Sequence, residues 1–329
     1  MKVLIIGALP PPIGGVAIHI KRFFEKFKNT NELQLILFDI KKMEIYYDNQ
    51  FVKAWLSIFS LLHIDVVHIH LSSNIKIPIA FLCKLFRKKV IYTHHNIRIK
   101  NIFIFKVFML FVDKLILVND KNISKYIKNY KYELIPAFLP SIEKTILPNL
   151  LVEKLKNYKN IISTNCFRLT FVNKKDLYGF DLCIDAFSRL VKTDKIKNTI
   201  LVLVDPSGTT TEYVRNLCAS FEDKNNCHIH LVNYAIDFNE LTKLSRMVLR
   251  ATRSDGDSLT IRESLYLNIP IIASDVTYRP DGTIIFRHED SKDLSDKILD
   301  VIEERNDKHE YTNIDYGEEV MMLYKKFEK

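Results

Sequence analysis

The sequence is poor in the residues that mark several classes of protein. Its 329 residues include only eight glycines and ten prolines, which excludes a low-complexity or disordered chain. The five cysteines are scattered, odd in number and without a C-x-x-C pair, so we expect neither disulfides nor a thiolate metal site, and a reducing cytosol is the simplest compartment. Long apolar runs are also absent, because Lys106, Asp113 and Lys114 interrupt the Phe- and Ile-rich stretch 102–118. A helix followed by a buried strand fits that stretch better than a membrane span.

The net positive charge of the sequence comes from its first half. Residues 1–150 contain 22 Lys and Arg against 10 Asp and Glu, a net charge of +12, whereas the remainder carries −3 of the total of +9. A basic half suits an anionic partner, which could be nucleic acid, an anionic membrane surface or a lipid-diphosphate substrate. No helix-turn-helix or RNA-binding signature is present, so a nucleic-acid-binding protein is kept only as an alternative.

Short apolar runs alternate with longer segments of helical spacing along the whole sequence. This alternation implies crossover units and parallel sheets, and the length suits two domains. We predict an α/β protein with two doubly wound, Rossmann-like domains in residues 1–150 and 151–310, and a tail helix in 311–329 that packs toward the first domain. Ligands of such sheets bind at the carboxyl ends of the strands. The predicted strands are 3–6, 33–38, 66–70, 90–93, 114–118, 133–136, 160–163, 199–204, 228–231, 247–250 and 269–273, and the predicted helices are 16–27, 52–62, 77–86, 102–111, 181–192, 210–221, 238–244 and 258–267.

The most informative segment is 253–275, an acidic loop followed by a short helix and a buried strand. Asp255 lies in the loop, and Glu263 lies eight positions later on the predicted helix. Asp257 or Ser258 is a candidate N-cap, and the free N–H groups of a first helical turn can hold a phosphate. A carboxylate that binds hydroxyls then lies close to an anion site, which suits a sugar nucleotide. Two alternatives remain: Asp255 and Asp257 could hold a divalent cation as a D-x-D pair, or the loop could be a plain helix cap.

Two further groups of residues follow predicted strands in the first half. Gly14 and Gly15 let backbone amides approach a phosphate or a sugar, but the loop is not the dinucleotide fingerprint G-x-G-x-x-G, and a tight turn would explain it as well. The histidines lack the spacing of a zinc motif, so we expect no metal, and hydrogen bonding to a sugar hydroxyl explains the strand-end ones better. Buried structural roles remain open for two of them, His63 and His68. The clustered histidines are His63, His68, His70, His94 and His95.

Together these segments resemble the retaining glycosyltransferases of family four, which have the GT-B fold of two Rossmann-like domains facing across a cleft. The resemblance spans nearly the whole chain. Its most specific part is Asp255 to Glu263, where the family has two glutamates separated by seven residues, and its closest form is a subgroup from bacterial surface-polysaccharide clusters. The other matching segments are Gly14-Gly15 with His19, Asp65–His70, Tyr92–Asn96, Ile135–Pro140 and Tyr178–Phe187.

The resemblance implies roles for particular residues. Asp255 would contact hydroxyls of the donor sugar, and Glu263 would bind the nucleotide ribose. His95 would contact the donor sugar near the reacting centre, with His94 as the competing choice. The expected donor-binding set is completed by Gly14, Gly15, Arg168, Lys175 and the backbone amides of Asp257, Ser258 and Leu259.

Three positions depart from the family pattern. Asp255 is one methylene shorter than the family's glutamate. Tyr178 stands where the family has a phosphate-binding lysine, whose charge Lys174 or Lys175 could replace, and Asp205 stands where a glycine is usual.

The expected activity is transfer of a sugar from a nucleoside diphosphate sugar to a hydroxyl of a saccharide acceptor, with retention at the anomeric carbon. We expect a lipid-linked acceptor in O-antigen or capsule synthesis, no metal or other cofactor, and a peripheral location at the inner face of the cytoplasmic membrane. A GT-B nucleotide-sugar epimerase is the main alternative.

Overall fold

The structure is a computed structural model that describes residues 1–10, 15–31, 33–47, 50–53, 63–96, 99–118, 123–127, 130–140, 145–304 and 316–328. The chain divides into two compact units. The first unit comprises Met1–Ile142 with Ile314–Lys329, and the second comprises Glu143–Asn313. The divisions therefore fall at 142 and 313, where the sequence suggested 150 and 310.

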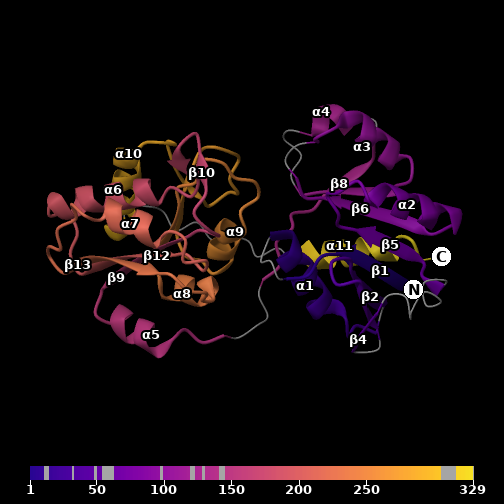
Figure 1. Ribbon diagram of the computed structural model, residues 1–329, viewed down its shortest axis with the longest axis horizontal. Helices are drawn as coiled ribbons and strands as arrows, with labels where there is room; N and C mark the ends of the chain where they lie inside the picture. Colours follow the sequence, from indigo (N-terminus) through magenta and orange to yellow (C-terminus); the bar gives the residue numbers. More distant parts are fainter. Residues whose placement is uncertain are drawn as a thin grey trace. The chain divides into compact units, whose positions relative to one another are not determined.

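The first unit is built on an eight-stranded sheet of order β4-β3-β2-β1-β5-β6-β7-β8 (Figure 1). From β2 to β8 neighbouring strands are parallel, and β3 and β4 extend one edge as an antiparallel hairpin. Buried apolar runs such as Val3–Ile6 are typical of a parallel sheet that is covered on both faces. The strands are β1 (Lys2–Gly7), β2 (Gln34–Asp39), β3 (Glu44–Tyr47), β4 (Gln50–Lys53), β5 (Val66–Ile69), β6 (Lys89–His94), β7 (Lys114–Leu117) and β8 (Tyr132–Leu134).

Helices cover both faces of the first sheet. Helix α1 packs on one face together with α11, whose Val320 and Tyr324 complete that hydrophobic core. The opposite face is covered by α2, α3 and α4 through residues such as Ala80 and Phe108. The unit is thus doubly wound, and the last helix of the chain belongs to its core. The helices are α1 (Gly15–Phe27), α2 (Lys76–Leu85), α3 (Ile102–Met109), α4 (Ser124–Ile127) and α11 (Tyr316–Lys325).

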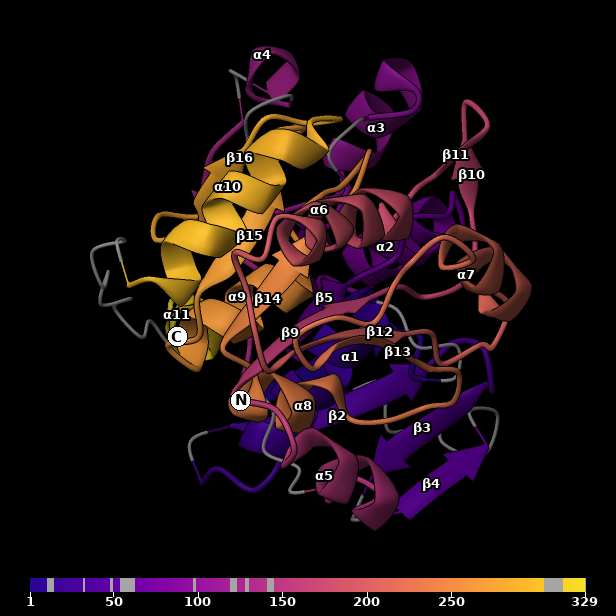
Figure 2. The ribbon, with the colours of Figure 1, turned by 90° about the vertical axis from the view of Figure 1, so that its left-hand side faces the viewer.

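The second unit contains a six-stranded parallel sheet of order β13-β12-β9-β14-β15-β16. Numbered within the unit, this order is 3-2-1-4-5-6, the order of a dinucleotide-binding doubly wound sheet. A small antiparallel hairpin, β10 with β11, stands apart from it (Figure 2). The strands are β9 (Asn160–Asn165), β10 (Phe171–Val172), β11 (Lys175–Asp176), β12 (Thr199–Val204), β13 (Cys227–Val232), β14 (Met247–Arg250), β15 (Ile271–Ser274) and β16 (Ile284–Phe286).

Two helical layers enclose this second sheet. Helices α6, α7 and α10 bury Phe187, Val214 and Ile298 on one face. Helices α5 and α8 cover the other face through Leu151 and Leu241, and α9 continues that layer. The predicted class, α/β with two doubly wound units, is therefore confirmed. The helices are α5 (Asn149–Leu155), α6 (Phe180–Lys192), α7 (Thr211–Leu217), α8 (Phe238–Leu244), α9 (Leu259–Tyr266) and α10 (Ser291–Ile302).

One predicted element is wrong in its described part. The sequence predicted a helix over 52–62, but Val52 and Lys53 pair in strand β4 with Ile45 and Glu44. Residues 54–62 lie outside the described residues. Apolar spacing over so few residues does not separate strand from helix, because the partner hairpin strand decides the outcome. Helix α5 (Asn149–Leu155) also spans the domain boundary that the sequence suggested at residue 150.

No helix in the described part of the chain is both long and apolar enough to cross a membrane, in keeping with the expectation from the interrupted stretch 102–118.

Candidate functional site

The second sheet reverses its strand order at β9, because β12 lies on one side of this first strand and β14 on the other. Ligands of open parallel sheets bind outside the carboxyl ends of the strands at such a reversal. The chain after β9 leads to Arg168, and the chain after β14 forms the loop to α9. Thr260 of α9 donates a hydrogen bond to Asn165 at the end of β9, with 3.2 Å between Oγ1 and Oδ1. The segment 251–263 is thereby fixed at the ligand-binding edge.

Ser258 is the N-cap of α9 and has extended backbone angles, but its side chain makes no capping bond. Its Oγ is buried and has no hydrogen-bond partner among the described residues. The first N–H groups of any α-helix also lack intrahelical partners. A buried hydroxyl and free helical amides at one point make a site for an anionic group such as a diphosphate. Ser258 and the amide of Leu259, both singled out in the sequence, lie at this point.

Asp255 does not point to an open space but is held between two arginines. Its Oδ2 accepts from Arg250 Nε at 3.1 Å and from an Arg279 nitrogen at 2.9 Å. Its Oδ1 accepts from Arg250 at 3.2 Å and from the Gly256 amide at 3.1 Å. A carboxylate offers about four acceptor positions, and these bonds use all of them. In this conformation Asp255 has no acceptor left for a sugar hydroxyl, unlike the role expected from the resemblance.

The carboxylate of Asp257 is also engaged, since Arg262 Nε lies 2.6 Å from its Oδ1. Burial raises the pKa of Asp257, and the Arg262 guanidinium opposes that shift. Asp255 and Asp257 both bind arginines, so a cation held by this D-x-D pair would have to displace guanidinium groups. The cap itself is Ser258, and Asp257 stabilises the first turn of α9 through Arg262.

Glu263 lies in the middle of α9 and is partly buried. Its Oε1 accepts a hydrogen bond of 3.1 Å from Asn239 Nδ2 of α8. The carboxylate is thus oriented by a neighbouring helix of the same unit.

The basic residues expected at the donor site have different surroundings. Arg168 is exposed, with its guanidinium carbon 5.9 Å from the centroid of the Phe167 ring. Lys175 is more than half exposed and pairs with Glu289 at 2.9 Å. Lys174 occupies the turn between β10 and β11 with a φ of 63°. Arg168 and Lys174 are therefore exposed, whereas Lys175 is engaged in an ion pair.

Arg253 is an organising residue that the sequence reasoning missed. Its buried side chain pairs with Asp181 at 2.8 Å and with Glu289 at 2.7 Å, and it donates to the Asp176 carbonyl. Asp176 accepts from the Phe180 amide at the start of α6. The loop after β14 is thereby tied to the opening of α6. Arg250 and Arg253, three positions apart, were a sequence signal for such a network. Nothing in the sequence pointed to Arg279.

The first unit has its own pocket of about 410 Å³ at the carboxyl ends of β1, β5 and β6. Gly15, the first residue of α1, lines it together with His70 and His95. Gly14 lies outside the described residues. His94 instead bonds to the Tyr92 hydroxyl at 3.1 Å and packs on Phe105 in the interior. Of the two neighbouring histidines, His95 is the one that lines the pocket.

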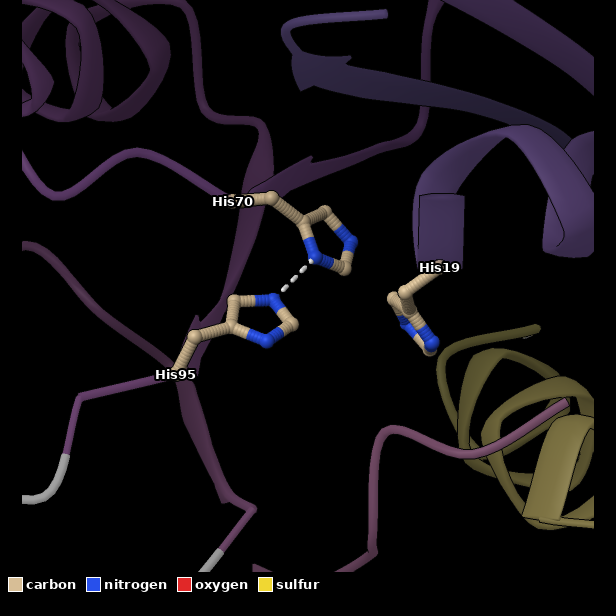
Figure 3. A group of neighbouring side chains, drawn as sticks. All are labelled: His19, His70 and His95. Carbon is tan, nitrogen blue, oxygen red and sulfur yellow. Dashed lines mark hydrogen bonds between the residues drawn. The ribbon is translucent and has the colours of Figure 1, made fainter. Parts of the chain in front are cut away.

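His19, His70 and His95 meet beside this pocket (Figure 3). His70 Nδ1 lies 2.9 Å from His95 Nε2, and the ring of His19 packs against both. His68 has a structural role, because its two nitrogens bond to Tyr324 and Thr93. His63 is exposed.

Residues 169–317, somewhat under half of the chain, match the model of the family described as glycosyl transferases group 1. The matched range contains the loop after β14 and helix α9. No protein of curated function has a significantly similar sequence.

Solved structures with the GT-B fold resemble nearly the whole chain. HepE from Anabaena in complex with UDP has a TM-score of 0.63 at 12% identity, over 94% of this chain and 92% of that one. The lipopolysaccharide outer core galactosyltransferase WaaB has a TM-score of 0.63 at 14% identity, over 99% and 100%. A UDP-N-acetylglucosamine 2-epimerase homologue from Listeria monocytogenes reaches 0.64 at 15% identity, over 98% and 95%. At these identities the likeness shows the fold, which is GT-B as the sequence predicted.

Proposed function

We propose that this chain, which has a GT-B fold and a group 1 glycosyltransferase domain in its second unit, transfers a sugar from a nucleoside diphosphate sugar to a hydroxyl of a saccharide acceptor with retention. The observation that carries the proposal is the N-terminus of α9, where the buried Ser258 hydroxyl has no hydrogen-bond partner among the residues that the structure describes and the helix begins at the strand-order reversal. The same helix carries Glu263.

The proposed donor site has three parts in the second unit. The amides of Asp257, Ser258 and Leu259 and the Ser258 hydroxyl would bind the diphosphate, whose negative charge increases as it leaves. Arg168, exposed after β9, would add a positive charge near that group. Glu263, oriented by Asn239, would accept hydrogen bonds from the ribose hydroxyls. Asp255 would act by holding Arg250 and Arg279 in place, since its own acceptors are used. The sugar contact proposed for His95 comes from the family resemblance.

The choice of UDP as the first donor to test follows from the similar structures. HepE was solved with UDP and with UDP-glucose, and a trehalose-6-phosphate enzyme from E. coli with UDP-2-fluoro glucose. GDP-sugars are the comparison set. The metal-independent mechanism expected from the sequence stays part of the proposal for this donor site.

Replacing Glu263 by alanine is expected to weaken donor binding and transfer by roughly tenfold to a hundredfold. The physical reason is the loss of hydrogen bonds to a charged acceptor, which contribute about 1.5–3 kcal/mol. Titration calorimetry with UDP-sugars and a transfer assay would measure both quantities.

Glu212→Ala is the matched control, because Glu212 is an exposed glutamate on α7 of the same unit. Its donor affinity should equal that of the wild type. Equal affinity in the Glu263 variant would contradict the proposed site. Product analysis separates the alternatives, since an epimerase converts the donor without any acceptor, whereas a retaining transferase joins it to one.

We also propose a peripheral location at an anionic membrane, with a lipid-linked acceptor, from an exposed apolar face of the first unit. Phe81, Leu82 and Phe86 at the end of α2 are at least half exposed, and Phe103 of α3 is 73% exposed. The two helices contact one another, and the ring of Phe81 lies 5.6 Å from that of Phe111, which follows α3. Basic residues lie near these apolar residues in the sequence, and such residues attract anionic lipid. These basic residues are Lys84, Arg87, Lys88, Lys100 and Lys106.

The double variant Leu82→Glu/Phe103→Glu is expected to lose binding to vesicles that contain an anionic phospholipid. Two buried apolar contacts are replaced by charges that the membrane repels. Flotation at low salt measures the bound fraction. Ile146→Glu is the control, because Ile146 is 90% exposed but belongs to the second unit. A wild-type protein that stays in the soluble fraction would refute the proposal.

A further inference from the structure

Three histidines from separate elements of the first unit converge on one point. His19 comes from α1, His70 follows β5 and His95 follows β6. One nitrogen of each ring can be chosen so that the three atoms all lie within 4.8 Å of one another (Figure 3). His19 and His70 are buried and His95 is partly buried. Histidine is the commonest metal ligand in proteins, and three imidazoles at one point can bind a single transition-metal ion.

The hydrogen bond of His19 leaves one ring nitrogen unprotonated and able to bind a metal ion. Its Nδ1 lies 2.9 Å from the Ala137 carbonyl oxygen, so Nδ1 carries the proton and donates. Its Nε2 is then the unprotonated nitrogen. Metal-bound histidines almost always donate their other N–H to a carbonyl or carboxylate, which fixes the tautomer and orients the ring. His19 already has this arrangement before any ion binds.

The spacing of the three nitrogens suits one ion after a small adjustment. Tetrahedral zinc binds imidazole nitrogen at about 2.0–2.1 Å, which places two such nitrogens about 3.3 Å apart. His70 Nδ1 and His95 Nε2 are 2.9 Å apart and need to separate by only a few tenths of an ångström. The N–H that they now share would move to the other nitrogen of its own ring, so that both rings stay neutral. Rotation of the His19 side chain would bring its Nε2 to the same ion.

We propose that His19, His70 and His95 bind one divalent transition-metal ion of the zinc type, with its remaining coordination position open to the pocket of the first unit. His70 and His95 line that pocket, so an ion can enter from it. This inference does not rest on the proposed glycosyltransferase activity. It also departs from the expectation of no metal. That expectation rested on the spacing of the histidines in the sequence, where His19 lies far from the other two.

The electrostatics of the cluster favour this class of metal. His19 Nδ1 donates to the Ala137 carbonyl, and His70 Nδ1 lies within hydrogen-bonding distance of His95 Nε2, a contact in which one of the two nitrogens must be unprotonated. Neutral imidazole is the ligand form. Among the described residues the cluster contains no carboxylate, which disfavours Mg²⁺ and Ca²⁺.

The nearby charge predicts what the fourth ligand would be. Arg22, one turn after His19 on α1, donates to the Leu139 carbonyl and contributes a positive charge that lowers the pKa of His19 after burial itself. An ion with three neutral ligands beside a guanidinium retains its full double charge. An anionic fourth ligand from the pocket, such as hydroxide or a phosphate oxygen, would balance it. If His95 also contacts a donor sugar, the bound ion would compete for that residue.

The test uses the full chain, freed of metal with a chelator. Titration with Co²⁺ is expected to give one equivalent of an intense visible spectrum, which four-coordinate Co²⁺ shows and six-coordinate Co²⁺ does not, and Zn²⁺ should displace it. Calorimetry with Zn²⁺ should give a stoichiometry of one, and Mg²⁺ and Ca²⁺ should not bind. His95→Ala and His19→Ala should each weaken Zn²⁺ binding at least tenfold, since each removes one ligand.

His63→Ala is the matched control, because His63 is an exposed histidine of the same unit, and its affinity should be unchanged. Circular dichroism checks that each variant is folded. Since His95 is only partly buried, its variant keeps the test decisive if His19→Ala fails to fold. A Co²⁺ spectrum of the six-coordinate type, or equal loss of affinity in the His63 and His95 variants, would overturn the site and leave adventitious surface binding.

Discussion

Asp255→Asn is expected to lower the free energy of unfolding of the second unit by about 3–5 kcal/mol, the usual effect of removing one partner of a buried ion pair. The Arg279 side chain is 2% exposed and that of Arg250 13%, so neither guanidinium can recover its hydration. The side-chain amide of the asparagine would also place its own N–H donors opposite the N–H donors of the two arginines. Burial tends to raise the pKa of Asp255, but Arg250 and Arg279 outweigh it and hold that pKa below its usual value.

Urea unfolding followed by two signals would measure this effect. Trp55 is the only tryptophan of the sequence, so its fluorescence reports on the first unit, while far-ultraviolet circular dichroism reports on both. Only the transition of the second unit should move to lower urea. The matched control is Glu153→Gln, since Glu153 lies 2.7 Å from Lys156 but both side chains are about two-thirds exposed. Its effect should stay within about 0.5 kcal/mol. A similarly small effect for Asp255→Asn would mean that the two arginines are solvated.

Gly179→Ala is expected to destabilise the second unit by about 2–5 kcal/mol. Gly179 is the N-cap of α6 and has a φ of 73°, where a side chain costs about 1–2 kcal/mol. A Cβ there would lie 2.1 Å from the carbonyl oxygen of Ala251 and 2.8 Å from its carbonyl carbon, both backbone atoms that cannot rotate away. Relieving such overpacking costs about 1–3 kcal/mol more. The displaced backbone is the start of the loop after β14, so donor binding should weaken as well.

Gly15→Ala is the control for this substitution. Gly15 is the first residue of α1, and a Cβ there would meet no heavy atom of the described residues within 4 Å. Alanine in a helix is favoured over glycine, so its stability should be unchanged or rise by up to about 1 kcal/mol. Thermal and urea unfolding of the two variants are compared directly. If both glycines tolerate alanine equally, the close approach of α6 to β14 is not rigid.

Strands buried on both faces were the easiest elements to predict. Thr199–Val204 and Met247–Arg250 have the bounds that their apolar runs predicted, because a central parallel strand must be apolar on both faces. The hairpin of β3 with β4 was not predicted, because its strands extend an edge of the sheet and their sequence lacks such a run. Residues 52 and 53 were therefore assigned to the wrong element.

The candidate site was likewise predictable from the sequence only in part. The loop after β14 and its helix could be located from local pattern, since capping residues, a short helix and a buried strand follow one another within 253–275. The partners of Asp255 could not, because Arg279 lies 24 positions away and meets it only through folding. The same holds for His19, which no strand-end pattern connects with His70 and His95.

By itself, the sequence determined the class of fold, the place of the helix that follows the acidic loop and the basic character of the first half, because all three depend on residue order over short distances. The tertiary structure alone decided that Asp255 binds arginines, that His95 rather than His94 lines a pocket, and that three histidines share one point. These outcomes depend on which strand ends become neighbours in a parallel sheet and on which charges must be paired once they are buried.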